Sequence, residues 1–410
     1  MKRLIGSRVV AAVLGDRVEA ALAPVLLVTM ISSTGFSGLW AYVGMWAVTY
    51  VHASSGAVGV MYALDAAAAA AGGYFGGRLS DRLGRRIVIV LGWGLEAMFA
   101  LALAATGRDL LLGFAFVVLA GAASGPGFAA TNAIVADLVP QVHQEEAYAI
   151  TRVATNLGFV GGPPLAAVTL IGEHWNLLFA VVGAIGLASA VVGLVSLPAT
   201  TVLADAEKVP RQGPFRALLG DTPFLLLICS ALLGYVVYVA YEVALPISAV
   251  TSYGVPPAIW GALVIIDPIL VLVLQVRLSR AIRTVPTAHR LGAGVVLMGF
   301  PFLLLIAHAS LWMVALVIVV FALGEMIWMP TSQALAASLA PARYRGAYMG
   351  AFGASSSAAW AIGPLFDLQL RGMFGNGATW MFTAVVGVMS ALSGMAACRL
   401  ARGNDGNLEL

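Results

Sequence analysis

Five carboxylic acids interrupt stretches of the sequence that are otherwise almost entirely apolar. They are Asp65, Glu96, Glu242, Asp267 and Glu325. No Lys or Arg lies at a matching position in these stretches to neutralise them. A carboxylate at the centre of a bilayer costs about 2.5 to 3.5 kcal/mol on insertion scales, so such acids must face the protein interior and be at least partly protonated. Their chemistry would be the uptake and release of protons or the binding of a positively charged ligand.

The composition places these acids in a membrane. The chain has 410 residues, of which 61% are hydrophobic and 10% are charged, whereas an ordinary soluble domain carries about 25% charged residues. This excludes a nucleic-acid-binding protein and a cytosolic enzyme, and the lipid bilayer becomes the first expected partner. Neither the two cysteines nor the five histidines have the spacing of a metal site. We expect no metal and no cofactor.

Twelve segments are long and apolar enough to cross a bilayer, which requires about 20 residues per helix. The predicted spans are 21–47, 55–77, 87–106, 110–138, 147–171, 175–197, 223–251, 257–276, 291–309, 312–338, 346–370 and 376–398. With a cytoplasmic N-terminus, every Lys and Arg except Arg108 and Arg371 falls on the cytoplasmic side, as the positive-inside rule requires. We therefore expect a multi-pass protein of the cell membrane with both termini cytoplasmic.

The two halves of the sequence resemble each other at an offset of about 200 residues, which indicates an internal repeat. The matching positions are Gly59 with Gly261, Asp65 with Asp267, and Gly162-Pro163 with Gly363-Pro364. The predicted fold is all-α, with twelve transmembrane helices in two pseudo-symmetric six-helix bundles. The predicted domains are bundles at 1–197 and 223–398, a cytoplasmic linker at 198–222 and a cytoplasmic tail at 399–410.

The loop between the second and third spans reads GRLSDRLGRR at residues 77–86. Positive-inside anchoring explains its arginines but not the placement of Asp81 and Gly84. The loop resembles the GxxxDRxGRR signature of the major facilitator superfamily at every fixed position. Those positions are Gly77, Asp81, Arg82, Gly84, Arg85 and Arg86. The resemblance implies a conformational switch in which Asp81 latches onto the N-terminus of the helix that starts near Arg345, with Asp137, Arg82 and Arg85 as candidate companions.

The fifth span carries a second motif, formed by Gly158, Gly162 and Pro163. It is similar to the GxxxGPxxGG motif of the antiporter branch of this superfamily, with Ala166 and Ala167 in place of the last two glycines. Small residues allow helices to approach closely in lipid. The resemblance to drug/proton antiporters has one departure, because those proteins often carry an intramembrane Arg in the fourth helix where this chain has Gly121.

In the fold that this resemblance implies, helices one, four, seven and ten line a central cavity, which puts Glu242 and Glu325 beside it. Tyr235 and Tyr238 precede Glu242 by seven and four residues, and Trp328 follows Glu325 by three, so each acid shares a helix face with aromatic rings. Acids beside aromatics suit lipophilic and cationic ligands. The alternative is aromatic packing between helices around buried neutral acids. For Asp65 and Asp267 a structural hydrogen bond competes evenly with a coupling role, and we expect Glu96 to be peripheral.

These observations predict a monomeric, proton-coupled secondary transporter that exports lipophilic compounds, cations among them, by alternating access. Its partners would be a small-molecule substrate and protons. The alternatives are an importer or exporter of a specific metabolite on the same fold, and a non-transporting membrane sensor. A membrane enzyme is disfavoured because the chain contains neither an HExxH nor a GxSxG motif.

Overall fold

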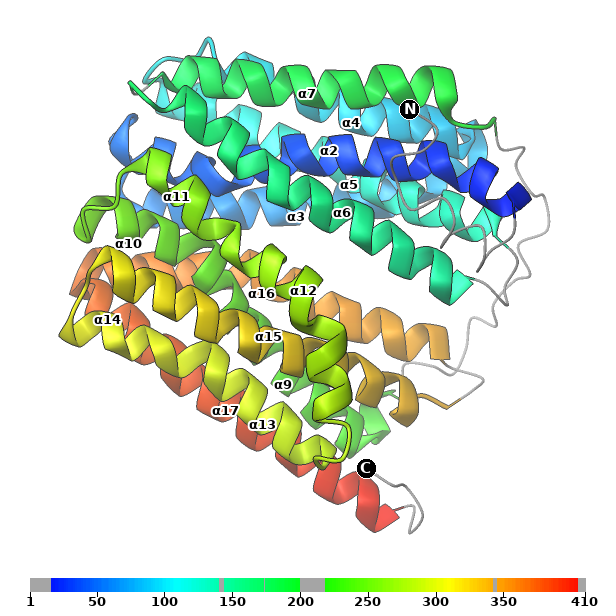
Figure 1. The fold of residues 1–410 in the computed structure, drawn as a ribbon, viewed down its shortest axis with the longest axis vertical. Coiled ribbons are helices and arrows are strands. Elements are labelled where there is room, and N and C mark those ends of the chain that lie inside the picture. The colour runs from blue at the N-terminus through cyan, green and yellow to red at the C-terminus, as the bar shows by residue number, and fades with distance from the viewer. Residues whose placement is uncertain (1–15, 140–143, 173, 200–217, 342–344, 405–410) are drawn as a thin grey trace. The chain divides into compact units, whose positions relative to one another are not determined.

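A computed structural model describes residues 16–139, 144–172, 174–199, 218–341 and 345–404, and none of these residues forms a strand (Figure 1). The helices of the first half are α2 (Asp16–Thr49), α3 (Ser55–Leu83), α4 (Arg85–Leu103), α5 (Leu110–Leu138), α6 (Gln144–Thr169) and α7 (Trp175–Ser196). Those of the second half are α9 (Thr222–Val239), η2 (Ala240–Ala244), α10 (Leu245–Ser252), α11 (Pro257–Val264), α12 (Ile266–Ala281), α13 (Thr287–Gly299), η3 (Phe300–Leu303), α14 (Leu304–Ala307), α15 (Leu311–Leu339), α16 (Arg345–Phe374) and α17 (Asn376–Asn404).

Helical structure occurs at each of the twelve predicted spans, and the all-α membrane fold is confirmed. Within the described residues, ten helical segments are long and apolar enough to cross a membrane. The two others are α6 and α16, with 26 and 30 residues. They are long enough to span, but polar residues such as Arg152, Asn156 and Gln369 make them less apolar. That these two helices cross the bilayer stays a prediction.

Contacts within the chain group it into two compact units. Unit 1 comprises Met1–His52, Leu64–Ala206 and Pro257–Pro268, and unit 2 comprises Ala53–Ala63, Glu207–Pro256 and Ile269–Leu410. Each unit therefore includes a short segment from the opposite half of the sequence: the start of α3 in unit 2, and α11 in unit 1. The predicted linker lies mostly outside the described residues, so its bounds stay a prediction.

The segments that join the opposite unit contain the two repeat-related glycines. In unit 2, a Cβ atom on Gly59 would lie 2.7 Å from the carbonyl oxygen of Pro364. In unit 1, a Cβ atom on Gly261 would lie 2.8 Å from the carbonyl oxygen of Pro163. Only glycine permits either approach without a shift of the backbone. The sequence repeat thus corresponds to the same glycine-to-proline helix contact, made once in each unit.

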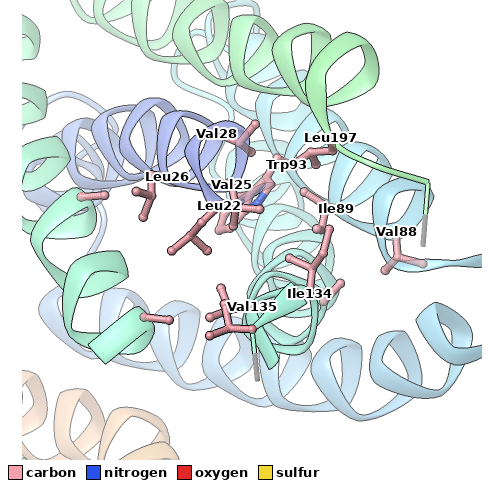
Figure 2. Packing of buried hydrophobic residues seen from close by; sticks show 14 residues of the cluster. Leu22, Val25, Leu26, Val28, Val88, Ile89, Trp93, Ile134, Val135 and Leu197 are labelled. Atoms are coloured by element: carbon pink, nitrogen blue, oxygen red, sulfur yellow. The ribbon is translucent and has the colours of Figure 1, made fainter. Parts of the chain in front are cut away.

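One core cluster of unit 1 consists of aliphatic side chains and one tryptophan (Figure 2). Leu22 and Val25 of α2, Trp93 of α4, Ile134 of α5 and Leu197 after α7 are all buried. Because lipid tails are as apolar as these side chains, van der Waals packing holds membrane helices together rather than the hydrophobic effect. Close packing of these helices fixes where the polar side chains of the same helices lie.

Candidate functional site

Glu242 lies in η2, the five-residue π-helical turn between α9 and α10. The cause is Pro246, which has no N–H to donate to the carbonyl of Glu242 and so breaks the regular helical ladder. The N–H of the preceding residue, Leu245, reaches back five residues to the carbonyl of Ala240, which is the hydrogen bond of a π-helix. Such π turns are frequent at functional sites because they change the direction of a side chain.

An aromatic cluster from α9, η2, α15 and α16 surrounds this acid. The hydroxyl of Tyr238 is hydrogen bonded to Glu242. The ring of Tyr238 lies 5.9 Å from that of Phe321 and 6.4 Å from that of Trp360, and Tyr241 stacks on Phe321 at 4.1 Å. Tyr241 and Phe321 are buried, whereas Tyr238 and Glu242 are partly exposed. Trp360 is partly exposed as well, so these three residues form the less buried part of the cluster.

Glu325 is buried in α15, one helical turn after Phe321. The aromatic residue expected beside it, Trp328, has no exposed surface. A Cβ atom on Gly234 would lie 2.2 Å from the Trp328 ring, and one on Gly294 would lie 2.8 Å from the Trp328 Cβ. Tyr235 meets the same ring edge-on at 5.1 Å. Trp328 and Tyr235 therefore pack between helices of unit 2, as the alternative that the spacing left open requires, and a place for them on a cavity wall stays a prediction.

Asp65 and Glu96 line one small cavity of about 10 Å³ in unit 1, together with Trp40, Gly121 and Ser124. This is about the smallest volume that can hold one water molecule. Both acids are buried, and the Oδ1 atom of Asp65 has no hydrogen-bond partner among the described residues. The expectation that Glu96 is peripheral was wrong, because the packing of α4 on α5 turns it inward.

Gly121 leaves the space that the carboxyl group of Asp65 occupies. A Cβ atom at position 121 would lie 2.1 Å from Oδ1 of Asp65. This is the fourth-helix position where the antiporters that the chain resembles often carry an Arg. The acid on α3 fits here because α5 has no side chain at this position.

Asp267 is buried in the same unit but does not belong to the residues that line this cavity. It is the second residue of α12, directly after the break that separates α11 from α12. Pro268 explains the break, because it has no N–H for the carbonyl of Val264. The repeat-related acids Asp65 and Asp267 therefore have different surroundings.

Arg85 is the centre of the loop motif. Its guanidinium donates to Oδ2 of Asp137 at 2.9 Å, to the hydroxyl of Ser80 at 2.7 Å, and to Oδ1 of Asp81. Gly84 forms the whole connection between α3 and α4, with φ of +90° and ψ of 148°, a conformation that is open to glycine and strained for other residues. The arginine thus joins the ends of three helices within unit 1.

The other arginines of the motif differ in their contacts. Arg86 donates to the carbonyl of Leu194 in α7, whereas Arg82 is exposed. Gly77 has open space where a Cβ would lie. Of the candidate companions of Asp81, the structure brings Arg85 and Asp137 together with it. The expected latch at the helix that starts near Arg345 stays a prediction.

The fifth-span motif lies where α6 packs against α2. A Cβ atom on Gly158 would lie 2.6 Å from the carbonyl of Met30, and one on Gly162 would lie 2.1 Å from Oγ of Ser37. The hydroxyl of Ser37 donates to the carbonyl of Gly158 at 3.4 Å. The motif therefore works as close helix packing, the role that its small residues predict.

Two residues of α16 were missed by the sequence reasoning. Asp367 is fully buried, and neither of its carboxyl oxygens has a hydrogen-bond partner among the described residues. One turn later, Arg371 donates to the hydroxyls of Ser55 and Thr251, and at 3.1 Å to the side chain of Asn376. The sequence signal that could have found them is an acid inside a predicted span, four residues before an Arg.

Close to this network, burial raises the pKa of the Tyr253 hydroxyl, which accepts a hydrogen bond from Trp380 at 2.6 Å.

Comparisons with known proteins agree with this fold and motif set. Residues 25–364 match the sequence pattern of the Major Facilitator Superfamily, and the chain belongs to that family. It is therefore a membrane transporter and not an enzyme. Similar relatives include a Na(+), Li(+), K(+)/H(+) antiporter of Planococcus maritimus, with 22% identity over 83% of this chain and 86% of the relative. Another is the multidrug resistance protein MdtH of Klebsiella pneumoniae, with 28% identity over 78% and 80% of the two chains.

Solved structures share the fold at low sequence identity. A peptide transporter of the POT type in complex with sulfate has a TM-score of 0.76 and 16% identity, covering 98% of both chains. A mutant of the nucleoside transporter NupG has a TM-score of 0.76 and 13% identity, covering 92% of this chain and 99% of the other. At these identities the structures establish the fold and leave the substrate to the chemistry of the site.

Proposed function

We propose that this transporter is a proton-coupled exporter of lipophilic compounds, cations among them, and that it works by alternating access. The observation that supports this most is the pairing of Glu242 with Tyr238 inside an aromatic cluster. Aromatic faces attract cations and provide apolar area for a lipophilic body, and a neighbouring carboxylate adds charge attraction. The relatives named multidrug resistance protein support the same substrate class.

Coupling follows from competition at a carboxylate. When Glu242 binds a proton, the site is neutral and its attraction for a cation is lost; when the proton leaves, the cation is again favoured. Glu325 is a second acid in the same unit, on the helix that contributes Phe321 to the cluster. We assign proton cycling and substrate binding to this pair of acids without fixing which residue does which.

A second candidate is the exchange of a monovalent cation for protons at Asp65 and Glu96. It is favoured by a cavity of one-water size between two acids, where an ion without its hydration shell would fit. The relative named Na(+), Li(+), K(+)/H(+) antiporter supports the same possibility. Gly121 and Ser124 would add backbone and hydroxyl oxygen atoms, which suit hard cations.

The first candidate is tested by the accumulation of a fluorescent lipophilic cation, ethidium, in cells with and without the expressed chain. We expect the native chain to lower accumulation and Glu242→Gln to restore it, because Gln keeps the shape but cannot ionise. Asp109→Asn is the matched control, since Asp109 is an exposed acid that caps α5 and Asn caps equally well. If Glu242→Gln still lowers accumulation as the native chain does, this acid does not carry the coupling.

The second candidate has a different readout. In inside-out vesicles with an imposed pH gradient, added Na⁺ or K⁺ should dissipate the gradient if the cation exchanges for protons. Asp65→Asn and Glu96→Gln should each abolish that response. A gradient that is dissipated by ethidium and unaffected by either cation would exclude the second candidate.

A further inference from the structure

One cavity of unit 2 lies outside the acidic and aromatic site. It has a volume of about 370 Å³ and lies between α12, α13 and α15. Four hydroxyl-bearing residues and one arginine supply its polar groups: Ser279, Thr287, Thr331, Ser338 and Arg290. The rest of the lining is apolar and includes Met326, Ile327 and Pro330. Neither the proposed export function nor the coupling acids require this cavity.

Most of its polar groups lie towards one end of the cavity. Ser279, Thr287 and Ser338 lie close to the ends of their helices, where α12 ends, α13 begins and α15 ends. Met326 lies twelve positions before Ser338 on α15, which is about 18 Å deeper at 1.5 Å per residue. The polar end of the cavity, here called its mouth, therefore lies near the ends of the predicted spans, and its apolar floor lies farther inside them.

The mouth is arranged for an anion. Nη2 of Arg290 donates to the hydroxyl of Thr287 at 3.0 Å, which holds the guanidinium in place. Nε of Arg290 is buried and has no hydrogen-bond partner among the described residues. Thr287 is also the first residue of α13, whose N-terminus has no side-chain cap, and uncapped helix N-termini bind phosphate oxygens. A phosphate group in the cavity would be attracted by the charge of the Arg290 guanidinium and by the helix end.

The surface around the mouth is basic. Arg277, Arg280 and Arg283 are exposed on the end of α12 and the loop that follows, and this side is the one predicted to be cytoplasmic. Basic pockets between membrane helices on that side bind the headgroups of anionic lipids. We propose that this cavity binds one anionic phospholipid, with its phosphate at Arg290 and Thr287 and an acyl chain against Met326, Ile327 and Pro330.

The test uses the full-length protein, delipidated in detergent and examined by native mass spectrometry. The added probes are phosphatidylglycerol, phosphatidylcholine and sn-glycerol 3-phosphate. We expect one phosphatidylglycerol to bind about fivefold more tightly than phosphatidylcholine, the effect of roughly one interfacial charge. Arg290→Gln should lose this preference, and the exposed Arg283→Gln should keep it. Ala334→Phe, which fills the cavity and keeps its charge, should lose the lipid as well.

Three results would overturn the proposal. Equal retention of phosphatidylglycerol by the native chain and Arg290→Gln would show that Arg290 does not bind the lipid. Equal affinity for phosphatidylglycerol and phosphatidylcholine would show that the cavity does not select an anionic headgroup. Binding of sn-glycerol 3-phosphate as tightly as phosphatidylglycerol would show that the cavity takes a free phosphate ester rather than a lipid.

Discussion

At the scale of the residue, Asp65 occupies the space that a side chain on Gly121 would need. Gly121→Ala places a methyl group 2.1 Å from a carboxyl oxygen and 2.9 Å from the backbone oxygen of Asp65. Because backbone must shift as well as side chain, we expect a loss of about 1 to 3 kcal/mol in the free energy of unfolding. The loss is measured as a lower thermal unfolding temperature in detergent.

The control for this substitution is Gly353→Ala. Gly353 lies in α16, and a Cβ atom there has nothing within 4 Å. Alanine in a helix interior is favoured over glycine by up to about 1 kcal/mol, so this variant should be neutral or slightly stabilised. Equal effects of the two substitutions would mean that Asp65 is not packed against Gly121.

At the scale of the element, the close contact between α2 and α6 depends on one face of α6. Gly162→Ala should lower the unfolding temperature, since its Cβ would lie 2.3 Å from the carbonyl of Thr34 and 2.1 Å from Oγ of Ser37. The neighbouring Gly161→Ala should not, because its nearest atom is 3.8 Å away. A loss of stability in Gly161→Ala equal to that in Gly162→Ala would contradict the packing of α6 on α2.

Sequence patterns predicted most of these elements because a long apolar segment in a membrane must satisfy its backbone hydrogen bonds internally, which a helix does. The resemblance of the loop motif named Arg82, Arg85 and Asp137 as candidate companions of Asp81, and the structure shows that Arg85 is the one that contacts both acids. Sequence patterns were wrong about Glu96, and for Trp328 they left both a cavity wall and helix packing open. Whether an acid lines a cavity or a ring packs between helices depends on how each helix is rotated about its axis. Packing against glycines such as Gly234 sets this rotation, and no local sequence pattern shows it.

At the scale of the whole molecule, the distribution of basic residues predicts which loops face the cytoplasm. A cysteine at Thr284, between α12 and α13, should be protected from an impermeant thiol reagent in intact cells. A cysteine at His174, before α7, should react. The native cysteines must first be replaced by serine, because Cys229 is exposed. If the cysteine at Thr284 were labelled and the one at His174 protected, the orientation would be the opposite of the predicted one. The twelve-span interpretation would then be wrong.

A carboxyl group in unit 2 is proposed to couple proton movement to substrate export, and flux measurements on purified protein in liposomes test this coupling. With an imposed pH gradient and ethidium on one side, the native chain should move ethidium against its concentration gradient while protons flow the opposite way. Glu242→Gln should abolish both fluxes in the gradient, with Asp109→Asn transporting as the native chain does. Uphill ethidium transport by Glu242→Gln at the native rate, or ethidium flux with no proton counterflow in the native chain, would contradict the account.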